Sequence, residues 1–281
     1  MVQAMNATIE ALFLYPVKSC RGIRLEAAEL AATGLAAHGI GDREWLIVDD
    51  AGEFITQRSA PRMALIATAL ERHSLWLHAP GMLSLEIPFE LEGDDITVRV
   101  WNDTLTATTQ GQLASDWFTR FLGTPCQLVR FDRRQQRLAD PRYTGTLEVP
   151  YQFADAFPLL VVSQASLDDF NARLQAQGEA AIGIERFRPN LVLGGIDAFG
   201  EDFIDEIRIG ELTLRLVKPC SRCPVPTIDP ATGLSHPAVG DLLNQFRATP
   251  EGVMFGVNAI VTAGAGREIR VGDEADISIR F

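Results

Sequence analysis

The sequence predicts an α+β, β-rich protein with two units and a few peripheral helices. Short apolar runs of strand-like composition, separated by turn residues, recur in both the first and the last part of the chain. Only three segments carry apolar residues at helical spacing. A length of 281 residues exceeds what a single hydrophobic core usually organises, so two packed units are expected.

The first unit, residues 1–125, is expected to be a β-rich domain. Alternating apolar and polar residues predict strands that bury one face at 12–14, 45–48, 64–70, 75–77 and 96–100. The segment 49–52 predicts a hairpin turn. A helix follows, because Leu113, Trp117 and Phe121 recur at helical spacing, with Gly123 placed as a left-handed C-terminal cap.

Residues 126–149 are expected to connect the two units. The stretch from 130 to 150 has weak periodicity, many charges and two prolines, which indicates a boundary.

The second unit, residues 150–281, again contains many strand-like runs. Strands are predicted at 159–162, 191–193, 207–209, 212–216, 258–262 and 277–281, with a hairpin across Gly210. One helix is expected to begin after Ser163 as its N-cap and to stop at Gly178, with Leu167, Phe170 and Leu174 pointing inward. A shorter helix, entered through Pro237, carries Leu242, Leu243 and Phe246.

The chain is acidic, with a formal net charge of −12 and a sequence pI of about 4.8. Phosphate binding relies on accumulated Lys and Arg, so this balance argues against a nucleic-acid groove. An anionic ligand must therefore be met by basic groups that are gathered locally.

The cysteines and the N-terminus indicate a reducing, cytoplasmic location. Four cysteines at uneven spacing, in a chain large enough to be stable without cross-links, are a poor match to a secreted disulfide framework. The first fourteen residues lack the basic region, the longer apolar run and the cleavage site of a signal peptide. No stretch approaches the roughly 20 apolar residues that a membrane span requires.

The densest candidate for chemistry is the segment Lys218–Pro224, which follows the strand predicted at 212–216. Cys220 and Cys223 are three residues apart, with Arg222 between them and Lys218 just before, in a positive local field that stabilises thiolate. Such a thiolate could bind a soft metal.

Three other interpretations of this pair stay open. Structural zinc needs four ligands, and the other two cysteines and the four histidines have unhelpful spacing. A thioredoxin-like redox pair would open a helix, whereas prolines at 219, 224 and 226 favour an irregular loop. Cysteines can also pack as small hydrophobes, which suits Cys20, Cys126 and Cys220.

Three further segments are weak signals when taken alone. The Lys18–Ser19 pair, the Asp42–Arg43 pair and the Arg186–Asn190 segment are each more often solvated turns than anion sites.

Together with Cys223 these segments resemble the MOSC superfamily, named for the C-terminal domain of molybdenum-cofactor sulfurases. The resemblance is to its two-part branch, which includes the mitochondrial amidoxime-reducing component and bacterial counterparts. The matching segments, in chain order, are Leu14–Cys20 with Gly22, Gly41–Arg43 with Trp45, Ser163–Leu167, Arg186–Asn190, Cys220–Cys223, Thr227–Gly233, Phe255–Gly256 and Val271–Asp273. The resemblance covers nearly the whole chain, and implies a MOSC N-terminal β-rich domain followed by a MOSC β-barrel-like domain.

The resemblance also implies a molybdenum cofactor bound in the cleft between the two units. In the family the second cysteine of the pair is the ligand to molybdenum, which makes Cys223 the metal ligand and a catalytic residue; a soft thiolate suits this metal. The cofactor's phosphate and polar ring are met in the family by side chains that match Lys18, Ser19, Arg43, Ser163, Arg188, Asn190, Ser221 and Arg222.

The roles of three residues, Ser163, Asn258 and Asp229, are less direct. Ser163 is also the expected helix N-cap, and both roles could coexist because a helix N-terminus is itself an anion site. Asn258 aligns with a position that contacts the cofactor in relatives, where a different residue type stands in place of Asn. Asp229 is either a catalytic acid in the substrate pocket or the first residue of an Asp-Pro turn, and the turn is favoured.

By resemblance the reaction is reduction of small N-hydroxylated or N-oxide-like molecules, with oxygen-atom transfer to molybdenum. An external ferredoxin-, flavodoxin- or cytochrome-like protein would supply electrons, since four cysteines cannot also hold a cluster. The alternatives are a cofactor carrier or sulfur-transfer module, and a scaffold without cofactor. Pyridoxal phosphate binding is implied only at the level of the superfamily.

One basic run has two interpretations. Arg130, Arg133, Arg134, Arg137 and Arg142 crowd a short segment of this acidic chain. They form either a solvated face or a docking patch for an acidic electron carrier, which would gain association rate from steering.

Overall fold

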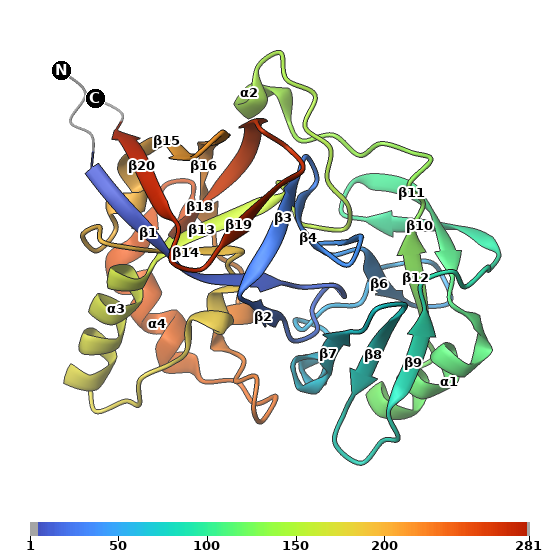
Figure 1. The fold of residues 1–281 in the computed structure, drawn as a ribbon. Coiled ribbons are helices and arrows are strands. Elements are labelled where there is room, and N and C mark those ends of the chain that lie inside the picture. The colour runs from blue at the N-terminus through green and yellow to red at the C-terminus, as the bar shows by residue number, and fades with distance from the viewer. Residues whose placement is uncertain (1–4, 280–281) are drawn as a thin grey trace.

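The structure, a computed structural model, describes residues 5–279. Its strands outnumber its helices, so the predicted β-rich α+β class is confirmed. Figure 1 shows a barrel with α3 (Gln164–Ala176) and α4 (Pro237–Arg247) on one side of the molecule. The sheets of the N-terminal half and α1 (Gly111–Leu122) lie on the other side.

Seven of the described strands close the barrel: β1 (Met5–Leu14), β13 (Leu159–Ser163), β14 (Leu191–Gly194), β15 (Ile204–Ile209), β16 (Leu212–Ser221), β18 (Gly252–Ala263) and β20 (Glu274–Ile279). They follow the order β13-β14-β1-β20-β15-β16-β18, and β18 pairs with β13 to complete the ring. Two short strands, β2 (Ile23–Leu25) and β17 (Ala248–Thr249), pair with β1 and β18. Closure leaves no free edge among the seven strands.

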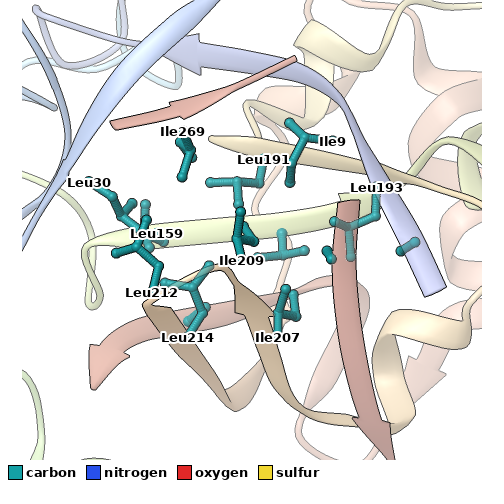
Figure 2. Close-up of a cluster of buried hydrophobic side chains, with 14 of the residues drawn as sticks. Ile9, Leu30, Leu159, Leu191, Leu193, Ile207, Ile209, Leu212, Leu214 and Ile269 are labelled. Carbon is teal, nitrogen blue, oxygen red and sulfur yellow. The ribbon is translucent and has the colours of Figure 1, made fainter. Parts of the chain in front are cut away.

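The barrel interior is an aliphatic core fed by alternate residues of these strands (Figure 2). Ile9 from β1 and Leu193 from β14 meet there although they are far apart in the sequence. The first strand of the chain therefore belongs to the same sheet as the strands of the C-terminal half, between β14 and β20.

A second apolar layer covers the outside of the barrel. Phe170 of α3 and Leu242 of α4 pack against outward residues of the strands, such as Phe13 and Phe255. Phe187, in the 3-10 helix η2 (Ile184–Phe187), stacks on Phe255 with ring centroids 3.8 Å apart. This layer fixes the loop that follows Phe187, which leads into the candidate site.

The N-terminal half forms smaller antiparallel sheets. The first contains β6 (Trp45–Val48), β10 (Asp95–Val100), β11 (Asp103–Thr109) and β12 (Gln127–Phe131), and the second contains β7 (Ala67–Leu70), β8 (Ser74–His78) and β9 (Leu85–Pro88). The third joins β3 (Ala27–Ala31), β4 (Gly34–Ala37) and β5 (Ile40–Gly41) to β19 (Arg267–Arg270) of the C-terminal half. The remaining helices are α2 (Pro141–Thr144), η1 (Pro61–Leu65), η3 (Gly200–Phe203) and η4 (Val225–Thr227).

Most predicted elements are confirmed. Ser163 accepts a hydrogen bond from the Ser166 amide as the N-cap of α3, and Gly123 adopts the left-handed conformation that ends α1. Pro237 opens α4, as expected. The hairpin across Gly210 joins β15 to β16. No helix within residues 5–279 is long and apolar enough to span a membrane.

Three local predictions are wrong. The run at 64–70 begins inside η1, which starts at Pro61, so the strand itself covers only Ala67–Leu70. Leu113 of α1 is 72% exposed instead of packed. The segment after Val217 is not an irregular loop: β16 continues to Ser221, with bulges that accommodate Pro219. The last two residues of the strand predicted at 277–281 lie outside the described residues.

Candidate functional site

A cavity of about 290 Å³ gathers residues from both halves of the chain. Its wall contains six basic side chains: Lys18, Arg43, Arg58, Arg188, Lys218 and Arg222. Asp155 is the one acidic residue among the described residues that line it. In a chain of net charge −12, this concentration of positive charge marks an anion site.

Lys18 is buried in the loop that follows β1. Its amide donates to the Trp45 carbonyl at 2.8 Å, which ties the loop to β6. Its ammonium donates to the Phe153 carbonyl at 2.6 Å and to Asp155 Oδ1 at 2.7 Å. Burial lowers the pKa of Lys18, and the Asp155 carboxylate opposes that shift. The charge is therefore held in place by an ion pair at the cavity wall.

Arg43 is fixed by contacts to both halves of the chain. It pairs with the buried Asp42 carboxylate, whose Oδ1 also accepts the Tyr15 amide at 2.9 Å. Its guanidinium donates to Asn190 Oδ1 at 3.2 Å and to the Arg188 carbonyl at 3.3 Å. The Arg43 guanidinium is thus oriented by Arg188 and Asn190, two residues of the second unit.

Arg188 enters the same wall from the loop after η2. Its Nη1 donates to the Cys20 carbonyl at 2.7 Å, while its Nη2 is buried without a hydrogen-bond partner among residues 5–279. Burial and the neighbouring Arg43 lower the pKa of Arg188 to about 10. An anion close to Arg188 would therefore stabilise the charged form of its guanidinium.

Backbone strain is concentrated at this cavity. Of the six non-glycine residues with positive φ among residues 5–279, four line it: Ser19 (67°), Arg43 (52°), Trp101 (58°) and Arg188 (56°). Such conformations are unfavourable for side chains with a Cβ and persist at sites where the surrounding structure enforces them. Their clustering is a second observation that favours this cavity as the candidate site.

The two thiols of the paired-cysteine segment have different environments. Cys220 is half-buried against the outer apolar layer, and its sulfur accepts a hydrogen bond from Arg222 Nη1 at 3.1 Å. Cys223 is exposed, lines the cavity and has no hydrogen-bond partner within residues 5–279. Only Cys223 presents a free sulfur to a ligand in the cavity.

Arg222 lies between these thiols in the sequence and on the cavity wall in space. Its Nη2 donates to the Phe187 carbonyl at 2.7 Å, and its Nε is buried without a partner among the described residues. Arg222 and Arg188 therefore each leave one buried N–H group unsatisfied, which a ligand oxygen could accept.

The structure brings together most of the residues proposed from the sequence. Lys18, Ser19, Arg43, Arg188, Asn190, Ser221, Arg222, Cys223 and Asn258 all line the cavity. Ser163 and Asp229 do not line it. The carboxylate of Asp229 pairs with Arg186 at 3.1 Å and accepts the Ala231 amide at 2.7 Å, which is the turn geometry favoured above.

Ser163 lies at the N-terminus of α3, next to the carboxylate of Glu201. The Ser163 amide and the Ser166 hydroxyl both donate to the buried carboxylate of Glu201, at 3.2 and 2.8 Å. Burial raises the pKa of Glu201. The Ser163 side chain is therefore engaged as the N-cap of α3, and its amide is paired within the protein.

Arg58, Trp101 and Asp155 line the cavity but were not proposed from the sequence, and Lys218 was proposed there only as a charge beside the paired cysteines. One compositional signal was available. Among the 25 basic residues of the chain only Lys18 and Lys218 are lysines, and both line this cavity.

The arginines of the connecting segment are paired within the chain. Arg130 and Arg133 both contact the buried Glu44 carboxylate, each at 2.6 Å. Arg137 is itself buried, pairs with Asp103 and donates to two backbone carbonyls. Arg134 and Arg142 also have carboxylate partners. The positive charge of the segment is compensated in place, which favours a structural role.

Two known domain families match this chain. The sequence profile of the MOSC N-terminal beta barrel domain matches residues 6–125, and that of the MOSC domain matches residues 148–276. Mitochondrial amidoxime reducing component 2 of Bos taurus and of Homo sapiens are each 36% identical over 232 residues, which cover 81% of this chain and 68% of theirs. Mitochondrial amidoxime-reducing component 1 of Danio rerio is 34% identical over 249 residues, 86% of this chain and 75% of its own. The chain therefore belongs to the MOSC family, in the branch that contains the mitochondrial amidoxime-reducing components.

Proposed function

We propose that this chain is a molybdenum-cofactor-dependent oxidoreductase that reduces N-hydroxylated or N-oxide-like small molecules, with an external electron-transfer protein as donor. The observation that carries the proposal is the meeting of one exposed thiol, that of Cys223, with six basic side chains in a single cavity. The names of the relatives support reduction of amidoximes as the reaction class.

The residues present fit the proposed cofactor. Its phosphate needs cationic and N–H donors, and the buried, unsatisfied Nη2 of Arg188 and Nε of Arg222 offer them. Molybdenum needs a soft ligand, and the Cys223 sulfur is free to supply it. The chemistry that the bound cofactor would supply is a two-electron reduction that removes oxygen from nitrogen.

The protein's own residues would position and isolate the reacting groups. Cys223 would hold the metal at the cavity wall, while Arg188 and Arg222 would hold the phosphorylated end of the cofactor. Arg43 is held by its ion pair with Asp42 and its hydrogen bond to Asn190. Its guanidinium would therefore not need to reorganise when the cofactor binds. Ser19, Ser221 and Asn258 add hydroxyl and amide groups for the polar ring.

A second function is favoured by the exposure of Cys223. An exposed thiol could hand over sulfur or the cofactor to another protein, which would make the chain a carrier or sulfur-transfer module. All four cysteines are free thiols, which supports the proposal of a reducing compartment such as the cytoplasm.

The proposal is tested by a matched pair of variants, Cys223→Ala and Cys220→Ala, made in a molybdenum-replete host. Molybdenum per chain is measured by mass spectrometry, and reduction of benzamidoxime is measured with reduced methyl viologen as donor. We expect Cys223→Ala to abolish reduction and lose most of the metal, whereas Cys220→Ala keeps both. Wild-type protein that contains molybdenum but reduces nothing, and passes the metal readily to an acceptor protein, would support the carrier. Equal effects of the two variants would contradict the assignment of Cys223.

A further inference from the structure

Two of the six cavity cations are compensated by carboxylates, and four are not. Lys18 pairs with Asp155 at 2.7 Å, and Arg43 pairs with Asp42. Arg58, Arg188, Lys218 and Arg222 make no ion pair within residues 5–279. Under the proposed function, the cofactor phosphate would be met by Arg188 and Arg222, whose buried N–H groups lack partners. Arg58 and Lys218 then remain without an anion.

Arg58 is held on the face of an aromatic ring. Its guanidinium carbon lies 4.4 Å from the centroid of the Trp101 ring, and within residues 5–279 the guanidinium makes one hydrogen bond, from Nε to Thr56 Oγ1 at 3.4 Å. Trp101 is itself fixed, because its Nε1 donates to Asp155 Oδ1 at 3.1 Å and its backbone has a φ of 58°. The Nη groups of Arg58 are therefore available to a ligand.

Lys218 has the same kind of support at the cavity wall. It lies on β16, half-buried, and its ammonium is 4.6 Å from the centroid of the Tyr143 ring. Its own carbonyl accepts from the Asn258 amide at 3.1 Å, which fixes the backbone. Hydrogen bonds from Arg142 lower the pKa of Asp140, and the charge of Lys218 adds a smaller effect, but the Asp140 carboxylate is paired with Arg142 and not with Lys218. The ammonium has no hydrogen-bond acceptor among residues 5–279.

Lys218 is half-buried without an acceptor, so its ammonium loses hydration and gains no anion in return, a loss that a bound anion would offset. Arg58 is exposed and keeps its hydration, but its Nη groups are unoccupied. Both cations rest on rings that orient them without occupying their N–H donors. This arrangement is preorganised for an acidic group rather than for a neutral one.

We propose that Arg58 and Lys218 bind an acidic group of the substrate, so that the cavity selects N-hydroxylated compounds that carry a carboxylate or phosphate. The inference rests on the proposed function and deepens it by naming the substrate class. Arg58 and Lys218 thereby become specificity-determining residues of the cavity.

The test compares two substrates that differ in one acidic group, benzamidoxime and 4-carboxybenzamidoxime, with the molybdenum-loaded protein. We expect wild-type kcat/KM to favour the carboxylate, mainly through a lower KM. In Arg58→Gln and in Lys218→Gln the ratio of the two kcat/KM values should fall by about tenfold, because one charge-assisted hydrogen bond is lost. Equal kcat/KM values for the two compounds in the wild-type protein would overturn the proposal.

Arg62→Gln is the matched control. Arg62 is also exposed and stacked on an aromatic ring, 4.5 Å from the centroid of Phe121, but it does not line the cavity. Its substitution should leave the substrate ratio unchanged. Molybdenum content is measured in every variant. Loss of metal in Arg58→Gln or Lys218→Gln would overturn the proposal, because it would assign these cations to the cofactor.

A second measurement decides the case in which neither amidoxime is reduced and the proposed function fails. The only amines of the chain are Lys18, Lys218 and the N-terminus, so acetylation of Lys218 can be followed by peptide mass spectrometry. Protection of Lys218 by 4-carboxybenzamidoxime but not by benzamidoxime supports the acid site independently of turnover. Equal protection by the two compounds, or none by either, overturns it.

Discussion

The guanidinium carbon of Arg188 lies 4.3 Å from the centroid of the Tyr15 ring, and that of Arg43 lies at the same distance from that centroid. One ring thus orders two arginines that come from distant parts of the sequence. The Tyr15 hydroxyl is buried without a hydrogen-bond partner among residues 5–279. Burial raises the pKa of Tyr15 well above its ordinary value, so the side chain stays a neutral phenol. The ring, and not the hydroxyl, is the part that organises the site.

Removing the ring of Tyr15 should therefore loosen the anion site, whereas removing the hydroxyl should not. Each cation–π contact contributes on the order of 1 kcal/mol, so Tyr15→Leu is expected to lower molybdenum retention at least about fivefold. Tyr15→Phe should keep the metal and should unfold at the same or a slightly higher urea concentration, because an unsatisfied buried hydroxyl is removed. The measurements are molybdenum per chain and urea unfolding. Tyr15→Phe losing as much metal as Tyr15→Leu would refute this role of the ring.

The position of the Tyr15 ring depends on a glycine. A Cβ added at Gly22 would lie 2.4 Å from Cε1 of Tyr15, a distance that forces the ring to move. Gly22→Ala is expected to cost about 1–3 kcal/mol of unfolding free energy through overpacking, and to reduce molybdenum content. In the control Gly200→Ala, the new Cβ would meet its nearest atom, in Ile196, at 3.7 Å, an ordinary contact. If the two variants were equally stable and equally loaded, the Gly22 contact would have no such role.

Local sequence signals predicted the helices of this fold. The order in which the strands pair could not be predicted, because it depends on residues far apart in the sequence. The cap at Ser163 and the left-handed Gly123 were read from neighbouring residues, and both are confirmed. Nothing near β1 indicates that it pairs with β14 and β20, because those partners are more than a hundred residues away. The continuation of β16 through Pro219 also depends on a partner, β18, whose bulged register tolerates a proline.

The candidate site likewise contains residues that the sequence predicted and residues that only the structure reveals. Resemblance to a family supplied Lys18, Arg188 and Cys223, and these line one cavity. Arg58 and Trp101 could not be predicted, because their role depends on where two separate turns of the N-terminal half lie relative to the barrel. Asp155 becomes visible only through its contact with Lys18. The family motifs therefore identified residues from their neighbours in the sequence, whereas Arg58, Trp101 and Asp155 are found only through tertiary contacts.

Ser163 should act as a helix cap alone. Its hydroxyl accepts the Ser166 amide at 3.0 Å, and its own amide donates to the buried Glu201 carboxylate at 3.2 Å. Ser163→Ala is expected to lower the unfolding free energy by about 1 kcal/mol and to leave molybdenum content unchanged. Urea unfolding and metal analysis of the same preparation check both parts. Reduced metal at unchanged stability would instead return Ser163 to the cofactor site.

Cys20 should make the protein sensitive to alkali. Burial raises the pKa of the Cys20 thiol from 9.0 to about 12. The unfolded chain therefore loses this proton first as the pH rises, and the stability that the neutral thiol contributes is fully present only below about pH 9.

The loss of that contribution should follow a defined slope. As the pH rises from about 9 towards 12, each unit removes at most about 1.4 kcal/mol from the unfolding free energy, because the folded state retains a proton that the unfolded state has released. Cys20→Ala is less stable at neutral pH, since it leaves a space in the core, but its stability should decline less steeply in this range. Other titrating groups, Tyr15 among them, act equally on both proteins, so the difference between the two slopes isolates Cys20. Unfolding in urea at a series of pH values measures it, and parallel slopes for the two proteins would show that the thiol does not ionise on unfolding as its burial requires.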